Sequence, residues 1–159
     1  MDTKGWIAIV RVRGQVCVNP DIRHTLHALR LYKKNYCVIV QNSQVFLGMI
    51  KKIRDYVTFG ELDEGTFAIL LKGRGRITSK KPLTAEYLKA KLNTDFTRFA
   101  KDFFAFKRDL GDVPGLKHFF KLHPPKGGFE RGGIKKAFAV GGALGYRGAA
   151  INALIQRMI

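Results

Sequence analysis

The residues of this chain best suited to chemistry are the cations of one glycine-rich segment, residues 118–147. This segment holds six Lys and Arg against one acid, Glu130, and glycines and aromatic residues lie between the cations. Lys and Arg neutralise phosphates, aromatic rings stack on exposed bases, and glycine, which lacks a Cβ, lets a backbone come close to a partner. Because so polar a segment buries little apolar surface, we interpret it as a loop that becomes ordered against structured RNA.

The charge of the whole chain also indicates an anionic partner. The 159 residues carry a formal net charge of +17, whereas a soluble domain functions well with a net charge magnitude of about 2–8. With 46% hydrophobic residues the chain can still form a core, which excludes a fully disordered tail. Nucleic acid fits better than an anionic membrane or an acidic protein, because the cations occur along the whole chain and concentrate in expected turns.

The apolar runs and the cysteines predict a cytoplasmic protein without a membrane segment. No run of about 18 apolar residues exists, and Arg11 and Arg13 interrupt the N-terminal apolar stretch that a signal peptide would need. Cys17 and Cys37 match no metal-ligand spacing, and both lie in apolar, strand-like sequence. We therefore expect two buried, reduced thiols, with a disulfide as the alternative.

Catalytic and cofactor sites are not predicted. The acids are scattered, so no carboxylate pair suits general acid–base catalysis, and His24 and His27 lack a Cys or carboxylate partner for a metal. The glycines at 73–75 lack the Lys-Ser/Thr ending of a phosphate-binding loop, and those at 142–148 do not fit the dinucleotide fingerprint. The second group instead places backbone amides and Arg147 at a helix start, where a phosphate can bind. We expect no enzymatic activity, no cofactor and no small-molecule substrate.

Hydrophobic periodicity predicts the elements that position these cations. Strands are expected at 6–13, 36–40 and 57–62, from β-branched and continuous apolar runs. Asn19 and Ser43 suit helix N-caps, and apolar residues at helical spacing follow each of them. The order β-α-β-α-β, with short connections, predicts an α+β fold in which two helices cover one layer of sheet.

The rest of the chain is expected to extend this core, so we divide the chain into residues 1–72 and residues 73–159. A third helix is expected from residue 63 or 64 to residue 72, ended by Gly73. The other expected elements are two helices capped by Thr84 and Thr94, a strand at 119–122 and a helix at 148–159.

The aromatic residues of the extension fall into two groups. Four Phe at helical spacing, 96, 99, 103 and 106, predict a core-facing stripe. Phe129, Phe138 and Tyr146 lie among glycines and cations, so they are the better candidates for stacking on bases. Packing of these three rings against the core is the alternative.

Together these residues resemble the large-subunit ribosomal protein family called L-thirty in bacteria and archaea and L-seven in eukaryotes. The resemblance rests on IAIVRVRG, NPDIRHTLHALRLYKKNYCVIV and FLGMIKKIRDYVTFGEL. The C-terminal part resembles the longer archaeal and eukaryotic form, through HPPKGGFERGGIKKAF, GGALGYRG and INALIQRM. The resemblance implies a loosely ferredoxin-like core with a small three-stranded antiparallel sheet, and a C-terminal extension of helices and a hairpin. It also implies a structural, non-enzymatic protein of an archaeal 50S subunit that takes part in translation.

The partners that the resemblance implies are large-subunit ribosomal RNA (23S, near the 5S RNA) and neighbouring large-subunit proteins, in the cytoplasm. Leu47 departs from the family, which commonly has Arg before the Gly-Met of the second helix, so an RNA contact there is in doubt. A free-standing RNA-binding protein or RNA chaperone is the alternative function. The predicted RNA-binding residues are Arg11, Arg13, Lys33, Lys34, Lys51, Lys52, Arg54, Arg74, Arg76, Lys121, His123, Lys126, Arg131, Lys135, Lys136 and Arg147.

Overall fold

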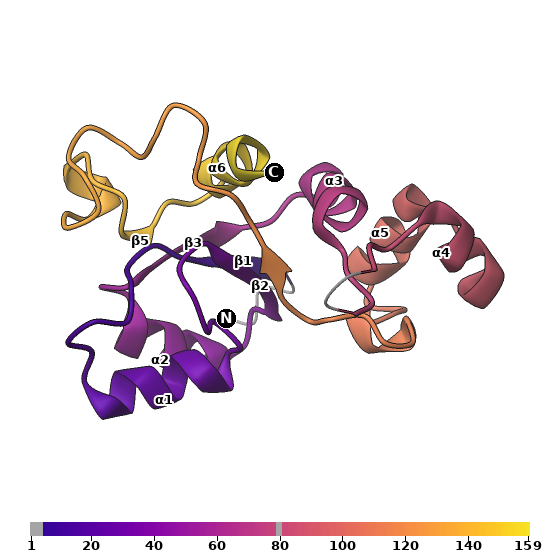
Figure 1. The fold of residues 1–159 in the computed structure, drawn as a ribbon, viewed down its shortest axis with the longest axis horizontal. Coiled ribbons are helices and arrows are strands. Elements are labelled where there is room, and N and C mark those ends of the chain that lie inside the picture. Colours follow the sequence, from indigo (N-terminus) through magenta and orange to yellow (C-terminus); the bar gives the residue numbers. More distant parts are fainter. Residues whose placement is uncertain (1–4, 79–80) are drawn as a thin grey trace.

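A mixed five-stranded sheet forms the centre of the computed structural model, which describes residues 5–78 and 81–159 (Figure 1). Strands β1 (Trp6–Arg11), β2 (Tyr36–Gln41) and β3 (Val57–Glu61) form its antiparallel middle, with β1 between the other two. Strand β4 (Phe120–Lys121) pairs antiparallel with β2, and β5 (Gly145–Tyr146) pairs parallel with β3. The α+β class is confirmed, and the expected three-stranded sheet gains one short strand at each edge.

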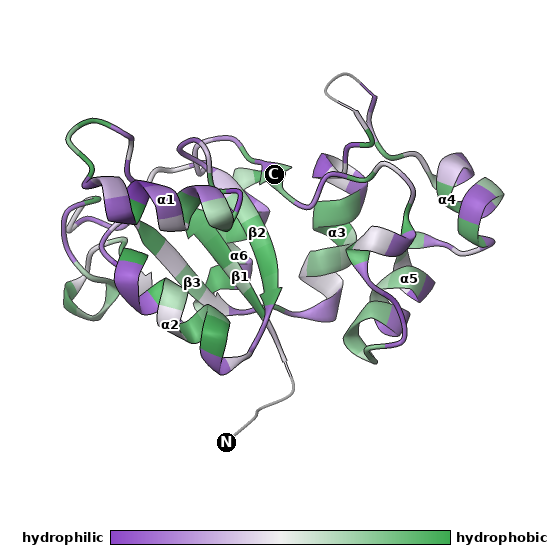
Figure 2. Ribbon diagram, turned by 90° about the horizontal axis from the view of Figure 1, so that it is seen from below, coloured by the Kyte–Doolittle hydropathy of each residue, from purple (hydrophilic) through white to green (hydrophobic). Residues whose placement is uncertain are grey.

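Helices α1 (Pro20–Ala28) and α2 (Gln44–Ile53) cover one face of the sheet, as the sequence predicts (Figures 1 and 2). Both predicted N-caps are confirmed, because the Asn19 side chain accepts from the Asp21 amide and Ser43 accepts from the Phe46 amide. Alternate residues of β1 pack against these helices, in a cluster that includes Ile7, Ile9, Leu26, Ile50 and Ile53. In Figure 2 both helices alternate between hydrophilic and hydrophobic segments, and their apolar residues pack against the sheet in this cluster.

The opposite face of the sheet is covered by residues that are distant in sequence. Trp6, Ala8 and Val10 are buried there in one cluster with helices α3 (Glu64–Arg74) and α6 (Ala150–Met158). Helix α3 continues through Gly73, which was expected to end it, and Gly75 follows its last residue. The division of the chain at residues 72/73 stays a prediction, and this hydrophobic cluster crosses it.

Helices α4 (Ala85–Leu92) and α5 (Phe96–Phe104), with the short helix η1 (Leu110–Asp112), form a lobe at one end of the molecule (Figure 1). The Phe stripe is confirmed for Phe99 and Phe103, which are fully buried, whereas Phe106 follows the helix and is 40% exposed. Thr84 caps α4 as predicted. The predicted cap at Thr94 is wrong, because Asp95 precedes α5 and Thr94 is buried.

Three further expectations concern the cysteines, the hairpin and membranes. Cys37 is buried in β2, but Cys17 is exposed in a loop at φ 55°, so only one of the two thiols belongs to the core. Strands β4 and β5 join opposite edges of the sheet instead of forming a hairpin with each other. Among the described residues, no helix has the length and apolar character needed to cross a bilayer, and no cluster of His, Cys, Asp and Glu suits a metal.

Candidate nucleic-acid interface

Residues 123–147, here called the basic loop, are joined to the sheet by one buried arginine. Arg147 donates from Nη1 to Glu130 Oε1 at 2.7 Å and from Nη2 to Glu130 Oε2 at 3.1 Å. Its Nε donates to Thr58 Oγ1 of β3 at 2.9 Å, and its Nη2 also donates to the carbonyl of Ala143 at 3.1 Å. The ring of Phe138 lies 4.6 Å from the guanidinium carbon. The single acid of residues 118–147 therefore serves an internal ion pair.

The environment of Glu130 favours its charged form. Partial burial alone would raise the pKa of this carboxyl group, because desolvation disfavours charge. The hydrogen bond from Arg147, together with the positive charges of Arg147 and Arg157, outweighs burial and holds the pKa of Glu130 below its usual range. The pair thus remains ionised at neutral pH.

Backbone hydrogen bonds within the basic loop also hold its shape. Gly132 N–H donates to the Gly141 carbonyl at 2.9 Å, and Leu144 N–H donates to the Lys136 carbonyl at 3.1 Å. A Cβ on Gly142 would lie 2.2 Å from the Lys136 carbonyl oxygen, so this glycine allows two parts of the loop to touch. Backbone pairing and the ion pair thus supply contacts that compensate for the small apolar surface of this loop. Its ordering against RNA stays a prediction.

Arg11 is the second predicted RNA contact that the structure places inside the protein. It is 1% exposed, and its Nη1 donates to the carbonyl of Leu31 at 2.7 Å, just beyond α1. Its Nε and Nη2 donate to the carbonyls of Arg13 and Gly14, both at 2.9 Å. Burial lowers the pKa of Arg11. Arg11 and Arg147 thus hold loops to the sheet, and their guanidinium groups are occupied by protein acceptors.

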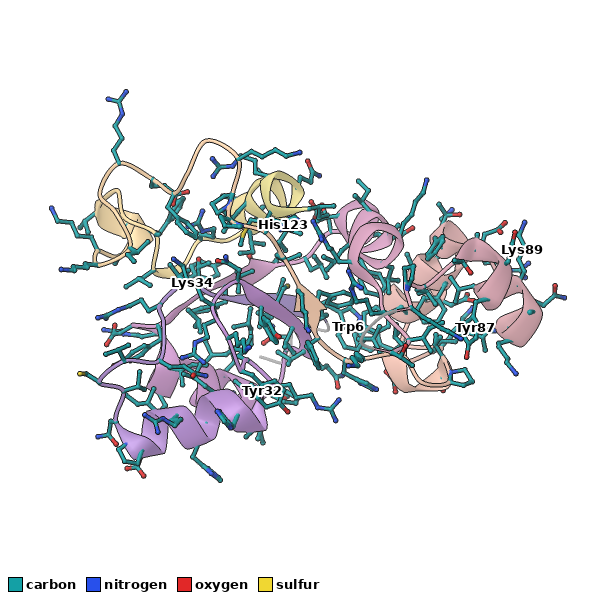
Figure 3. All side chains as sticks on the ribbon, in the orientation of Figure 1. Trp6, Tyr32, Lys34, Tyr87, Lys89 and His123 are labelled. Carbon is teal, nitrogen blue, oxygen red and sulfur yellow. The ribbon has the colours of Figure 1, made fainter. Side chains whose placement is uncertain are left out.

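The other predicted cations lie at or near the surface. Three of them are half-buried: Arg13, Arg74 and Arg76. Arg74 donates to the carbonyl of Ile159, and burial, followed by the charge of Arg76, lowers its pKa. Eleven predicted residues are exposed: Lys33, Lys34, Lys51, Lys52, Arg54, Lys121, His123, Lys126, Arg131, Lys135 and Lys136. His123 lies beside α6 (Figure 3), and Leu47, which replaces the family's Arg, packs against the α1–α2 cluster.

Part of this cationic surface surrounds a cleft of about 570 Å³ between α2, strands β3 and β5, and the basic loop. Arg13, Lys51, Arg54 and Lys135 line it, together with Asp55. Its apolar lining comes from Phe59, Ala137, Phe138, Ala139, Leu144, Gly145 and Tyr146. The structure thus unites cations from three separate segments, whereas Lys33, Lys34, Lys121, His123 and Lys126 lie outside the cleft lining.

Tyr146 is the most exposed aromatic residue in this cleft lining. It is 58% exposed, and its hydroxyl donates to Glu61 Oε1 at 2.6 Å. That hydrogen bond, with lesser contributions from burial and the Glu61 charge, raises the pKa of Tyr146. Of the three predicted stacking candidates, Phe129 packs against the core and Phe138 lies against Arg147. Tyr146 is therefore the candidate whose ring is available for stacking. The sequence did not predict the contacts of Phe59 and Glu61 with Tyr146, because only the pairing of β3 with β5 brings these residues together.

Comparisons with known proteins all give the same family. A family model described as Ribosomal protein L30p/L7e matches residues 7–57. The chain is 49% identical over 149 residues to the large ribosomal subunit protein uL30 of Methanopyrus kandleri, covering 93% of this chain and 100% of that protein. It is 51% identical over 152 residues to the uL30 of Nanoarchaeum equitans, covering 96% and 97%. The uL30 of Methanococcus vannielii is 45% identical over 152 residues, covering 96% and 98%.

Proposed function

This chain belongs to the Ribosomal protein L30p/L7e family, and from that premise we propose that it binds ribosomal RNA as a structural component of the large ribosomal subunit. The family is structural, so the chain is not an enzyme. The observation that carries the proposal is the near-full-length similarity to archaeal uL30 proteins. Its expected partners are 23S RNA, with 5S RNA close by, and neighbouring large-subunit proteins in the cytoplasm.

The proposed mechanism is neutralisation of phosphates by a preformed surface. Exposed cations displace the counterions of RNA phosphates, which makes affinity strongly dependent on salt. The hydrogen bonds within the basic loop support a loop that is folded before binding, and less ordering entropy would then oppose association than for a disordered arm. Recognition is expected to follow RNA shape, because the deep major groove of A-form RNA hides the bases from side chains.

Sucrose-gradient sedimentation of a native cell extract tests the proposal at low and moderate salt. We expect the chain to migrate with the large subunit under both conditions. Migration at the top of the gradient would contradict the ribosomal role and favour a free-standing RNA-binding protein or RNA chaperone. This outcome would separate assembly into the subunit from general affinity for RNA.

A matched pair of triple variants tests which cations act on the RNA. Replacing Lys51, Lys135 and Lys136 by Ala should weaken binding of ribosomal RNA fragments. The slope of log binding constant against log salt concentration should also become shallower by about 1 for each lost phosphate contact. The control replaces Lys89, Lys91 and Lys101 of the lobe by Ala, which removes the same charge. Equal losses of affinity in filter-binding measurements would show that total charge, and not this surface, determines binding.

A further inference from the structure

The cleft between α2, strands β3 and β5, and the basic loop has a more specific use than general phosphate binding. We propose that it holds a single unstacked nucleotide of a structured RNA, with the base against Tyr146 and the phosphates against Lys51, Lys135 and Arg13. This inference rests on the proposed function, since it names one binding mode of the same surface. Its volume of about 570 Å³ lies within the range of about 300–1,000 Å³ that is typical of small-ligand sites.

Tyr146 is built as a rigid platform for a base. Its hydroxyl is held by Glu61 at 2.6 Å, and its ring lies 5.7 Å from that of Phe59 at an angle of 51°. Both contacts come from β3, to which β5 is paired, so the ring is fixed while more than half of it remains exposed. A ring whose orientation is already fixed loses little entropy when a base stacks on it.

The cations around this platform suit a nucleotide backbone. Arg13 is oriented by its hydrogen bond to the Asp55 carbonyl at 3.2 Å and by the Tyr56 ring at 5.0 Å. Among the described residues, neither Lys51 nor Lys135 forms an ion pair. Asp55, the one carboxylate among the described lining residues, lies 3.7 Å from Arg54 in an exposed pair. The lining therefore keeps an excess of positive charge beside an apolar, aromatic surface.

This combination selects a nucleotide over other anions. A carboxylate-rich peptide would satisfy the cations but would leave the Tyr146 ring and the apolar lining without a matching surface. A fully paired RNA helix offers phosphates, but its bases are stacked inside and cannot reach a concave site. A bulged or looped-out nucleotide offers both a base face and phosphates on either side, so it matches both parts of the cleft.

The test uses two RNA hairpins that differ only in one bulged 2-aminopurine. We expect the full-length protein to bind the bulged hairpin more tightly and to quench its fluorescence, because the base stacks on Tyr146. Tyr146→Ala should weaken binding of the bulged hairpin by about 5- to 150-fold, the usual range for one lost base–aromatic stack. Affinity for the fully paired hairpin should change less than about twofold, because surface cations supply it.

Two further variants keep the test decisive. Tyr146→Phe retains the ring and should retain the preference for the bulge. Tyr87→Ala removes a tyrosine in the α4 lobe, far from the cleft (Figure 3), whose hydroxyl likewise has a hydrogen bond, to the Pro114 carbonyl. This control should leave both affinities unchanged, and thermal melting checks that each variant is folded.

The outcomes separate the two proposals. Equal affinity of the wild-type protein for both hairpins, with no effect of Tyr146→Ala, would overturn the nucleotide cleft and leave the proposed function standing. A wild-type protein that bound neither hairpin would contradict RNA binding itself. Polyglutamate and unlabelled bulged RNA are then compared as competitors of the bulged hairpin. If both displace it equally well, the cleft does not select a nucleotide, and an acidic protein partner is favoured.

Discussion

Two neighbouring segments of similar length, the lobe at residues 84–117 and the basic segment at residues 118–147, are stabilised in opposite ways. The lobe carries seven Lys and Arg against five Asp and Glu, whereas the basic segment carries six against one. In the lobe, Lys89 and Asp95 lie 3.3 Å apart, and Arg108 and Asp102 lie 3.7 Å apart. Its stability comes mainly from the buried rings of α5, because the Lys89–Asp95 pair is exposed and the Arg108–Asp102 pair is only partly buried.

The basic segment has few buried rings, and its one acid forms a partly buried ion pair. Glu130 holds Arg147, and Arg147 holds the basic loop to Thr58 of the sheet. Five exposed cations of the segment, Lys121, Lys126, Arg131, Lys135 and Lys136, are left facing solvent. One internal pair and backbone hydrogen bonds can therefore hold a loop while its remaining charge stays available to a polyanion.

The largest effect is expected in the lobe. Phe103 is 1% exposed and stacks on Phe67 and Trp6, with ring centroids 4.4 and 3.9 Å away. Phe103→Ala should lower the free energy of unfolding by about 3–5 kcal/mol, the usual cost of removing a buried aromatic side chain. Chemical denaturation measures this loss. Phe106→Ala is the control, and a similar loss in both variants would show that burial does not stabilise the lobe.

A smaller effect is expected at the base of the basic loop. Arg147→Met should lower the free energy of unfolding by about 2 kcal/mol, less than the 3–5 kcal/mol for a fully buried pair, because Glu130 can regain water. Hydrogen exchange of the loop amides should quicken more than that of β1. A double variant with Glu130→Gln should recover part of the loss, which a double-mutant cycle measures. Unchanged hydrogen exchange of the loop amides in Arg147→Met would show that the ion pair does not order the basic loop.

The smallest effect is expected from acid. The pKa of Glu130 is lower in the folded protein than in the unfolded chain. The ion pair therefore stabilises the protein fully at pH values above the pKa of an unfolded-state Glu, about 4.3. This contribution should disappear as the pH falls through the folded pKa, and it should be flat near neutrality. Melting temperatures of the wild type and Glu130→Gln should therefore converge in acid. Curves that stay parallel from neutral to low pH would contradict a role for the Glu130 charge.

Much of the local structure could be predicted from the sequence. The predicted caps at Asn19, Ser43 and Thr84 are confirmed. Each cap side chain accepts a hydrogen bond from an amide only two or three residues further along the chain, so the local sequence is enough to predict it. The burial of Phe99 and Phe103 follows from helical spacing. Gly73 was expected to end α3, but the helix passes it because tertiary packing against the C-terminal segment overrides the local signal.

The candidate site could be predicted only in part. The composition of residues 118–147 indicated cations and three candidate aromatic residues, Phe129, Phe138 and Tyr146, of which Tyr146 is the exposed one. Charge alone could not separate Lys135, which lines the cleft, from Arg147, which is buried beneath the loop. Both are cations among glycines and aromatics, and only their partners in the fold differ.

By itself, the sequence determined the order of helices and strands, the excess of positive charge and the family, because these depend on residue types and short spacings. Only the tertiary structure decided which cations are available. Arg147 meets Thr58, 89 positions away, and Arg11 meets the Leu31 carbonyl, 20 positions away. Such partners become neighbours when the sheet forms and the loops close over its ends. A buried guanidinium must then find protein acceptors, since losing water without them would be too costly.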